Sequence, residues 1–304
     1  MARIDFRQLQ YFVAVAEELN FTRAARRCHV VQSALSYQIA KLERDTGVAL
    51  FERTSRAVRL APAGRTLLPR ARHILAELDL AGAELTALAG VLTGKLRLGM
   101  IGSASVAAPS VEHALAMFHR RHAGVEITVE DTGSANMADR IRDGELDLAF
   151  VGLFADQVPA DLSHRVLQVE PLVAVLPPTH RLVTGRDAID LAELAGEEFV
   201  ELRPESGLRR QVDAAFDRAG VSRSIAFELS TSDNVVRFVQ LGFGVALVPR
   251  SSVRGRDVPA RRLSDDRARH PVSLVHRSPA PSAPAAQAFL ALLDRPRPTV
   301  GPGS

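Results

Sequence analysis

The chain has 304 residues, which is enough for about two domains. Hydrophobic residues make up 46% of it and charged residues 24%, so a wholly disordered, collagen-like or coiled-coil chain is excluded. No apolar run reaches the roughly 18 residues of a membrane span, and the first residues lack the apolar core of a secretion signal. We therefore expect a cytoplasmic protein. Its single cysteine, Cys28, excludes an intramolecular disulfide.

Charge is distributed unevenly along the chain. Residues 1–65 carry eleven Arg or Lys against six Asp or Glu, a net charge of +5, whereas the remainder carries a net charge of −2. A basic head on a near-neutral body indicates a polyanionic partner, such as nucleic acid, for the head alone. The preference for Arg over Lys suits phosphate binding, and it suits a GC-rich genome equally well.

The basic head contains the pattern of a helix-turn-helix. An apolar stripe at helical spacing runs from Phe6 to Leu19, and Asn20 is a competent N-cap for a short helix over residues 21–28. A second helix follows a brief turn at Val30, because apolar residues recur at four- and three-residue steps at Leu35, Ile39 and Leu42. These two short helices are expected to cross at a steep angle.

The other face of the second helix carries uncharged hydrogen-bonding side chains and one cation, which suits contact with base edges and phosphates. Its members are Gln32, Ser33, Ser36, Tyr37 and Lys41. A plain solvated face, the alternative, would more usually carry pairs of Glu and Lys. Further along, two short apolar runs flank a tip with Arg53 and Arg56, which predicts a β-hairpin wing whose arginines reach phosphate or the minor groove.

A heptad pattern follows over residues 71–92, where apolar positions step by three and four residues. Such a seam is buried well only against a second helix, so we expect a homodimer contact, with packing against the chain's own helices as the alternative. Pro69 fits the first turn of a helix and would break an interior turn, so the helix is expected to start or kink there.

After Lys95 the pattern changes to short apolar runs that alternate with helix-length segments, which predicts βα units on a largely parallel sheet. The sheet pattern restarts after about Val166 and returns near His270. We therefore divide an α/β body over residues 95–294 into two lobes. One lobe comprises residues 95–166 and 267–294, the other residues 167–266, and residues 295–304 form a flexible tail.

The run from Phe6 to Gly64 resembles the winged helix-turn-helix of LysR-type transcriptional regulators. The matching segments, in order, are Leu9–Phe12–Val15–Ala16–Glu17, Phe21–Thr22–Ala24–Ala25, Gln32–Ser36, Ile39–Leu42–Glu43–Gly47, Leu50–Phe51–Arg53 and Arg56–Val58–Leu60–Pro62–Ala63–Gly64. One departure is Val31, where the family usually has a Ser that caps the second helix. Either this cap is weaker by about 1 kcal/mol or Ser33 takes it over.

The resemblance implies a multidomain α+β protein. It would comprise a winged helix-turn-helix domain over residues 1–65, a linker helix over 66–94, and a two-lobed α/β domain, similar to periplasmic binding proteins, over 95–294. The implied function is that of a sequence-specific transcriptional regulator that binds double-stranded DNA as a homodimer or homotetramer and responds to a small-molecule effector. Besides the residues given above, the implied DNA contacts include Thr22 and Arg23.

The effector is expected between the lobes, where strands end and helices begin. Small hydroxylated loops at helix N-termini offer hydroxyl and N–H donors to an anion, so we expect a small carboxylate. By resemblance, the contacts of the first lobe are Ser103, Ser105, Thr132 and Ser134, and Thr231 lies in the second lobe; Arg203 and Pro204 are expected to face them. The alternative for each Ser or Thr is a helix cap.

We expect no catalytic residue, cofactor or metal, because the sequence lacks the common phosphate-binding, dinucleotide-binding, nucleophile-elbow and zinc motifs. One alternative is a two-lobed binding protein without a regulatory role. Another is an aspartic-type hydrolase using Asp131, whose flanking residues copy half of the signature of that class. A two-cysteine peroxide switch, known within the resembling family, is excluded because Cys28 is the only thiol.

Overall fold

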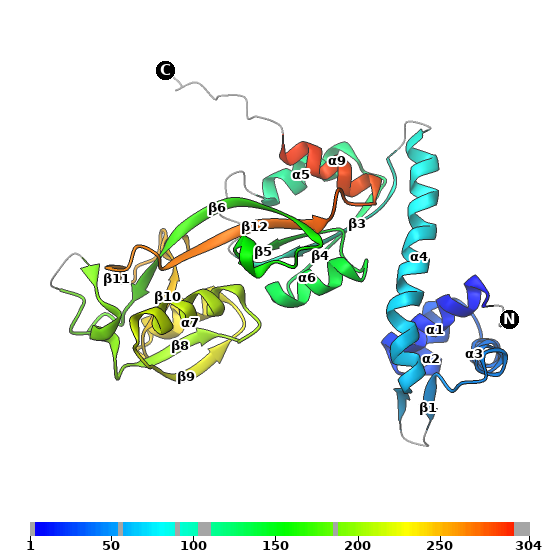
Figure 1. The fold of residues 1–304 in the computed structure, drawn as a ribbon, viewed down its shortest axis with the longest axis horizontal. Coiled ribbons are helices and arrows are strands. Elements are labelled where there is room, and N and C mark those ends of the chain that lie inside the picture. The colour runs from blue at the N-terminus through cyan, green and yellow to red at the C-terminus, as the bar shows by residue number, and fades with distance from the viewer. Residues whose placement is uncertain (1–3, 54–56, 89–91, 103–110, 185–187, 295–304) are drawn as a thin grey trace. The chain divides into compact units, whose positions relative to one another are not determined.

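The computed structural model describes residues 4–53, 57–88, 92–102, 111–184 and 188–294. Two compact units form, the first from residues 1–94 and 143–145 and the second from residues 95–142 and 146–304 (Figure 1). In the described ranges, no helix is both long enough and apolar enough to cross a membrane.

The first unit holds four helices and a two-stranded hairpin. In chain order these are α1 (Phe6–Glu18), α2 (Phe21–Arg27), α3 (Gln32–Thr46), β1 (Phe51–Arg53), β2 (Val58–Leu60) and α4 (Pro62–Leu88). The three short helices enclose one apolar core that includes Phe12, Leu35 and Phe51. The helices predicted for the helix-turn-helix and the hairpin of the wing are thus confirmed.

Helix α4 begins at Pro62, so of the two outcomes expected at Pro69, a start or a kink, the start is wrong. Proline suits the first helical position because the N–H that it lacks would have no partner there, and Pro62 fills that position. Pro69 lies inside the helix, at the expense of one backbone hydrogen bond. The predicted domain boundary between residues 65 and 66 falls within this helix.

The start of α4 is packed closely against the hairpin. Gly64 faces the backbone of Leu50, and a Cβ at this glycine would overlap the Leu50 carbonyl oxygen. The same carbonyl accepts a hydrogen bond from the N–H of Ala61 at 2.9 Å. Only glycine therefore allows the helix to lie this close to the wing.

Most strands of the second unit belong to one sheet, in the order β4-β3-β5-β12-β6-β11-β7, with β10 also paired to β6. Their bounds are β3 (Gly94–Met100), β4 (Val125–Glu130), β5 (Leu148–Val151), β6 (Leu162–Val175), β7 (Ala188–Ile189), β10 (Ala246–Pro249), β11 (Ala260–Leu263) and β12 (Arg269–Arg277). The prediction of a largely parallel sheet is wrong. Strands β3 and β5 are parallel, but β12 is antiparallel to both β5 and β6, and β6 is antiparallel to β10 and β11.

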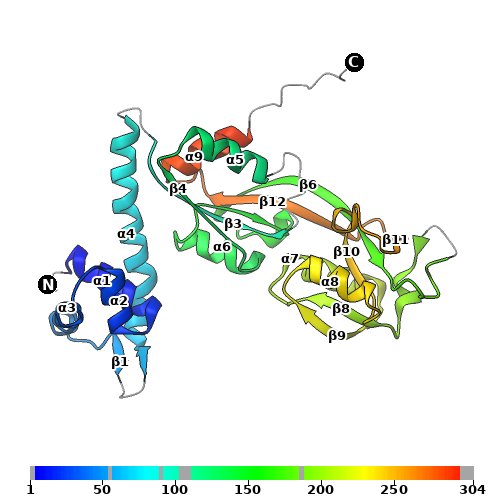
Figure 2. The ribbon, with the colours of Figure 1, turned by 180° about the vertical axis from the view of Figure 1, so that it is seen from behind.

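The long strands β6 and β12 run side by side and connect the two halves of the second unit (Figure 1). The first half also contains α5 (Val111–Arg121), α6 (Ser134–Arg142) and α9 (Pro284–Leu293). The other half contains the parallel pair β8 (Glu198–Leu202) and β9 (Ser224–Leu229), with α7 (Gly207–Ala219) and α8 (Ser232–Gln240), all labelled in Figure 2. The predicted lobe boundary at residues 166 and 167 lies within β6.

Separate apolar cores support the two halves. In the first half, α6 buries Met137 and Ile141 against strands that include β5. In the other, Phe199 of β8 packs edge-to-face on Phe216 of α7, with ring centroids 5.2 Å apart. Helix α8 closes a second small core there with Val236.

Candidate nucleic-acid interface and effector site

Helix α2 begins as the sequence predicts. The side-chain oxygen of Asn20 accepts hydrogen bonds from the N–H groups of Thr22 and Arg23, each at 3.0 Å. Helix α3 follows after a short turn and buries Leu35 and Ile39 completely. The cap and the apolar stripe orient α3 so that its opposite face is turned to solvent.

That opposite face holds the residues predicted to read DNA. Gln32, Ser33, Tyr37 and Lys41 are exposed, and Ser36 is half-buried. The Gln32 amide donates to the Ser36 hydroxyl at 3.1 Å, which orders two of these polar groups on successive turns. The arrangement offers donors and acceptors in a row, as major-groove reading requires.

Val31 is the N-cap residue of α3, and its side chain makes no capping hydrogen bond. The helix begins at Gln32, so the alternative in which Ser33 takes over the cap is wrong. Val31 has extended backbone angles (φ −74°, ψ 144°) and is 69% exposed. An end of the predicted recognition helix therefore lacks the side-chain acceptor that α2 has in Asn20.

The predicted DNA contacts at the start of α2 are exposed, and the Arg23 side chain already has a partner. Thr22 and Arg23 are both exposed. The Arg23 guanidinium lies 3.0 Å from the Glu18 carboxylate, and the Arg27 guanidinium lies 2.7 Å from the Glu17 carboxylate. Such exposed pairs are weak and exchange readily for a phosphate partner.

Arg53 of β1 contacts both helices of the helix-turn-helix. Its guanidinium donates to the Glu43 carboxylate at 3.2 Å and lies 4.4 Å from the centroid of the Phe21 ring. Glu43 is a residue to which the sequence assigned no role, since its contacts with the wing depend on tertiary packing. Arg56 lies outside the described residues.

The loops predicted to bind the effector are partly described. Ser103 and Ser105 lie outside the described residues. Thr132 is exposed, whereas Ser134 is fully buried at the start of α6, where its hydroxyl accepts from the N–H of Gly152 at 3.0 Å. Thr231 caps α8, with its hydroxyl 3.3 Å from the N–H of Asn234. Both hydroxyls thus serve local structure in this state.

Two of these loops lie against each other, although they are far apart in sequence. A Cβ at Gly207 would lie 2.7 Å from the Ser134 hydroxyl and would overlap the Gly152 carbonyl oxygen. The Gln211 side chain donates to the same carbonyl at 3.3 Å and to the Gln157 side chain at 2.7 Å. The N-terminal end of α7 therefore packs directly on the loop before α6.

Arg203 and Pro204 are exposed in the turn between β8 and α7. The Arg203 N–H donates to the Leu229 carbonyl at 3.1 Å, which places this turn beside the end of β9, two residues before Thr231. The loop of Arg203 therefore lies next to the loop of Ser134 on one side and next to the loop of Thr231 on the other. All three loops lie where strands end and helices begin.

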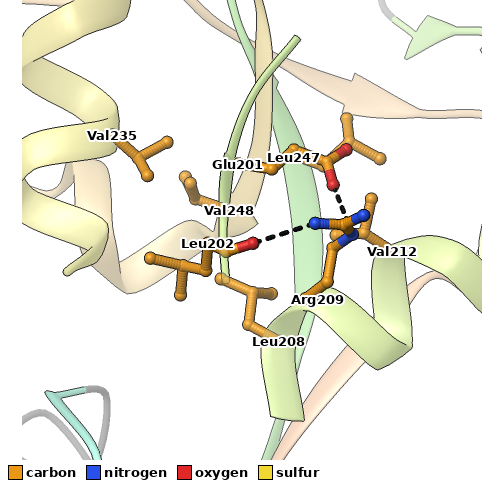
Figure 3. A pocket seen from close by; sticks show the side chains of 8 residues that line it. All are labelled: Glu201, Leu202, Leu208, Arg209, Val212, Val235, Leu247 and Val248. Atoms are coloured by element: carbon orange, nitrogen blue, oxygen red, sulfur yellow. Dashed lines mark hydrogen bonds and ion pairs between the residues drawn. The ribbon is translucent and has the colours of Figure 1, made fainter. Parts of the chain in front are cut away.

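A small pocket opens beside these loops, with about 220 Å³ of empty space including its open mouth (Figure 3). Its walls are mainly apolar and come from β8, β10 and the first turns of α7 and α8: Leu202, Leu208, Val212, Val235, Leu247 and Val248, with Glu201 and Arg209. The Arg209 guanidinium lies 2.8 Å from the Glu201 carboxylate and donates to the Leu202 carbonyl at 3.1 Å. The sequence did not single out these residues, because their side chains read as ordinary core.

A buried charge network lies behind this pocket. Glu201 is 4% exposed and pairs with both Arg209 and Arg223, the latter Nη2 at 2.9 Å from Oε2. Asp213 adds a second carboxylate at 3.0 Å from Arg209. Although burial opposes the charged guanidinium, the carboxylate partners hold the pKa of Arg209 and Arg223 above the usual range.

Asp131, the residue of the hydrolase alternative, closes a local turn. Its carboxylate accepts from the N–H of Gly133 at 3.3 Å. Burial raises the pKa of Asp131, and that hydrogen bond opposes the shift. Within the described ranges, no group of three or more His, Cys, Asp or Glu side chains is arranged to hold a metal ion.

Two family models match the chain in consecutive segments. Residues 6–65 match the bacterial regulatory helix-turn-helix protein of the lysR family, and residues 89–296 match the LysR substrate binding domain. Together they cover the helix-turn-helix and the two-lobed body described above.

Relatives extend along most of the chain. The regulator BudR of Raoultella terrigena is 36% identical over 82% of this chain and 85% of its own length. The uncharacterized regulator YnfL of Escherichia coli is 35% identical over 83% of this chain and 84% of its own length.

Among solved structures, a full-length OxyR variant from Pseudomonas aeruginosa has a TM-score of 0.71 at 28% identity, covering 97% of this chain and 95% of its own. Full-length CbnR in complex with its target DNA has a TM-score of 0.68 at 25% identity, covering 95% and 98%. The chain therefore belongs to the LysR family: it is an oligomeric DNA-binding transcriptional regulator whose C-terminal domain binds a small-molecule effector.

Proposed function

We propose that α3 is the recognition helix and reads base edges through Gln32, Ser33, Ser36, Tyr37 and Lys41. The observation that carries this assignment is the division of α3 into two faces. Leu35, Ile39 and Leu42 are fully buried, while the proposed reading residues stand on the other side with polar groups exposed. A helix anchored in this way enters the major groove with its free face first.

The phosphate contacts are proposed for the start of α2 and for the wing. Thr22 and Arg23 lie exposed in the first turn of α2, and their hydroxyl and guanidinium groups are the donors proposed for a phosphate, since the backbone N–H groups there already donate to Asn20. The Arg53 side chain is 40% exposed, and its guanidinium is the proposed phosphate contact of the wing. Arg56 is assigned by its place in the sequence, at the tip of the wing.

We further propose that the chain dimerises through residues 71–92, of which residues 71–88 belong to α4 and residues 89–91 lie outside the described residues. Three large apolar residues of the predicted seam are exposed on this chain, Ile74 at 45%, Leu78 at 50% and Leu85 at 70%, whereas Ala71 at its start is buried in the apolar core of the first unit. Large apolar side chains in one stripe of a helix are stable in water when a partner helix covers them. The seam thus packs on the chain's own helices at Ala71, and the exposure of the three larger residues supports a dimer contact beyond it.

The effector is proposed to be a small carboxylate bound by the loops that contain Thr132, Ser134, Arg203 and Thr231. Three helices, α6, α7 and α8, begin at these loops. Their N-terminal N–H groups and the exposed Arg203 favour a negative charge.

We propose that the chain is not an enzyme. A two-lobed binding protein without a regulatory role would not need the basic helix-turn-helix, and the Asp131 carboxylate closes a turn with Gly133. Since the partner is DNA, the chain is expected to work in the compartment that holds the chromosome.

The DNA assignment is tested with a duplex that the full-length protein selects from a random library, compared with a scrambled duplex. Ser33→Ala and Ser36→Ala are expected to lower the ratio of specific to non-specific affinity by about tenfold each, the cost of a lost base contact. Arg56→Ala is expected to weaken both duplexes alike and to reduce the salt slope by about 0.9.

Ser224→Ala, at an exposed position of β9, is the matched control and should bind as the wild type does. Equal losses on both duplexes from the serine and arginine variants would refute this division of roles. For the effector, a thermal-shift screen of small organic acids followed by DNA-binding assays is decisive. If no acid shifts both melting and DNA binding, the proposed carboxylate class is wrong.

A further inference from the structure

Glu43 is the one acidic side chain of α3 whose carboxylate bonds to the wing in the described structure. One of its oxygens, Oε1, accepts hydrogen bonds from the N–H groups of Leu50 at 2.9 Å and Phe51 at 3.1 Å. The other, Oε2, accepts from the guanidinium of Arg53 at 3.2 Å. A single carboxylate therefore accepts from three donors at and just before the strand that enters the wing. Charged hydrogen bonds of this kind are the strong ones.

The same cluster reaches the first helix of the helix-turn-helix. Phe51 and Arg53 alternate with Glu52 along β1, so they face the same side of the hairpin. On that side the Arg53 guanidinium lies over the Phe21 ring, and the Phe21 and Phe51 rings meet edge-to-face with centroids 5.8 Å apart. Glu43 thus connects α3, β1 and, through Arg53, α2.

The carboxylate itself is unsuited to touch DNA, because it would repel phosphate. Its side chain is 20% exposed and its oxygens point at the strand. A role in DNA binding must therefore act through the groups that it holds.

We propose that Glu43 is a positioning residue for DNA binding: it fixes the wing strand and Arg53 at one distance from the recognition helix, so that helix and wing meet the duplex together. This inference rests on the proposed function of α3 and the wing. It predicts that the wing's phosphate contacts depend on Glu43, whereas the fold of the helix-turn-helix, with its separate apolar core, does not.

The test uses the full chain, the duplex selected by the wild type and a scrambled duplex, with binding measured over a range of salt concentrations. Glu43→Ala is expected to weaken both duplexes about tenfold and to flatten the salt slope by about 0.9, the loss of one phosphate contact. Arg53→Ala is expected to do the same. The double variant should bind no worse than either single variant, because both changes disable one unit.

Glu43→Gln separates the two sets of contacts. Its amide oxygen can still accept from the N–H groups of Leu50 and Phe51, but its NH2 group cannot accept from the Arg53 guanidinium, so this variant should recover only part of the affinity lost in Glu43→Ala. Glu52→Ala is the matched control, since it removes the same charge from the other face of β1 and should retain the wild-type salt slope. Circular dichroism and melting curves identify any variant that fails to fold. If Glu43→Ala does not fold, the coupling between positions 43 and 53 is measured instead from Glu43→Gln and Arg53→Ala, each alone and both combined.

The inference is overturned if Glu43→Ala keeps the wild-type affinity and salt slope, if it binds more tightly than Glu52→Ala, or if the losses of Glu43→Ala and Arg53→Ala add in full. Failure of the proposed function is distinct, because it appears in the wild type: no duplex is then preferred over the scrambled one.

Discussion

A serine at position 31 is predicted to stabilise the recognition helix. Val31 is the N-cap of α3 but offers no acceptor, and its neighbour Ser33 is at the second helical position, where the N–H needs one. The chain contains its own precedent. Ser206 has nearly the same backbone angles (φ −71°, ψ 134°) and its hydroxyl accepts from the N–H of Leu208, two residues on, at 3.2 Å.

The magnitude follows from these observations. Val31 already has a capping backbone conformation, so Val31→Ser requires no rearrangement, and the valine is 69% exposed, so little apolar burial is lost. A serine cap contributes about 1 kcal/mol relative to a residue without an acceptor. In a unit of fewer than about 100 residues this corresponds to a rise of roughly 5 °C in melting temperature.

Calorimetry of the full chain measures the effect. The relevant transition is the one that rises when duplex DNA is added, since a ligand stabilises the unit that binds it. Val31→Ala is the matched control, because it removes the same methyl groups without adding an acceptor. If Val31→Ser melts at the same temperature as Val31→Ala, the argument from the Ser206 geometry is refuted.

Three further predictions concern the second unit, and thermal or denaturant unfolding measures each. Arg223→Met leaves the buried Glu201 with one cation fewer and is expected to lower the free energy of unfolding by about 3 kcal/mol. Arg218→Met, which breaks an exposed pair, should lower it by less than about 1 kcal/mol, and equal losses would contradict this prediction. Burial lowers the pKa of His270 to about 4, so as the pH falls from about 6.5 to 4 the unfolded chain binds a proton before the folded chain does. The free energy of unfolding should therefore drop by roughly 3 kcal/mol over this range, and His270→Leu should not show this loss. Gly207→Ala places a methyl group where the two lobes touch and should destabilise by about 1–3 kcal/mol; an unchanged melting temperature would show that the contact is loose.

Local signals predicted the N-terminal unit well. Asn20 marks the start of α2 by its own hydrogen bonds, and the spacing of Leu35, Ile39 and Leu42 defines the buried face of α3 without reference to any other element. Once that buried face is known, the opposite face of α3 must be the exposed one. Glu43 was missed because its partners depend on how the hairpin packs on the helix, which no periodicity records.

The sheet was harder to predict for a different reason. An apolar run indicates a buried strand but not its direction, so the antiparallel strand β12 was not anticipated. Strand β6 is apolar and buried over its last four residues, but the half of it near Ser163 has mostly exposed or half-exposed side chains and lacks the continuous apolar run that indicates a buried strand. Likewise, the pocket beside Arg209 is made by residues that meet only in the folded lobe.

The missing side chain at Gly64 has a mechanical consequence. Since α4 rests directly on the Leu50 backbone, with no flexible group between them, a rotation or tilt of this helix carries the wing with it. Any larger residue at position 64 would force the helix and the hairpin apart, because its Cβ would overlap the Leu50 carbonyl oxygen. The joint between them is therefore rigid only while this position carries no side chain.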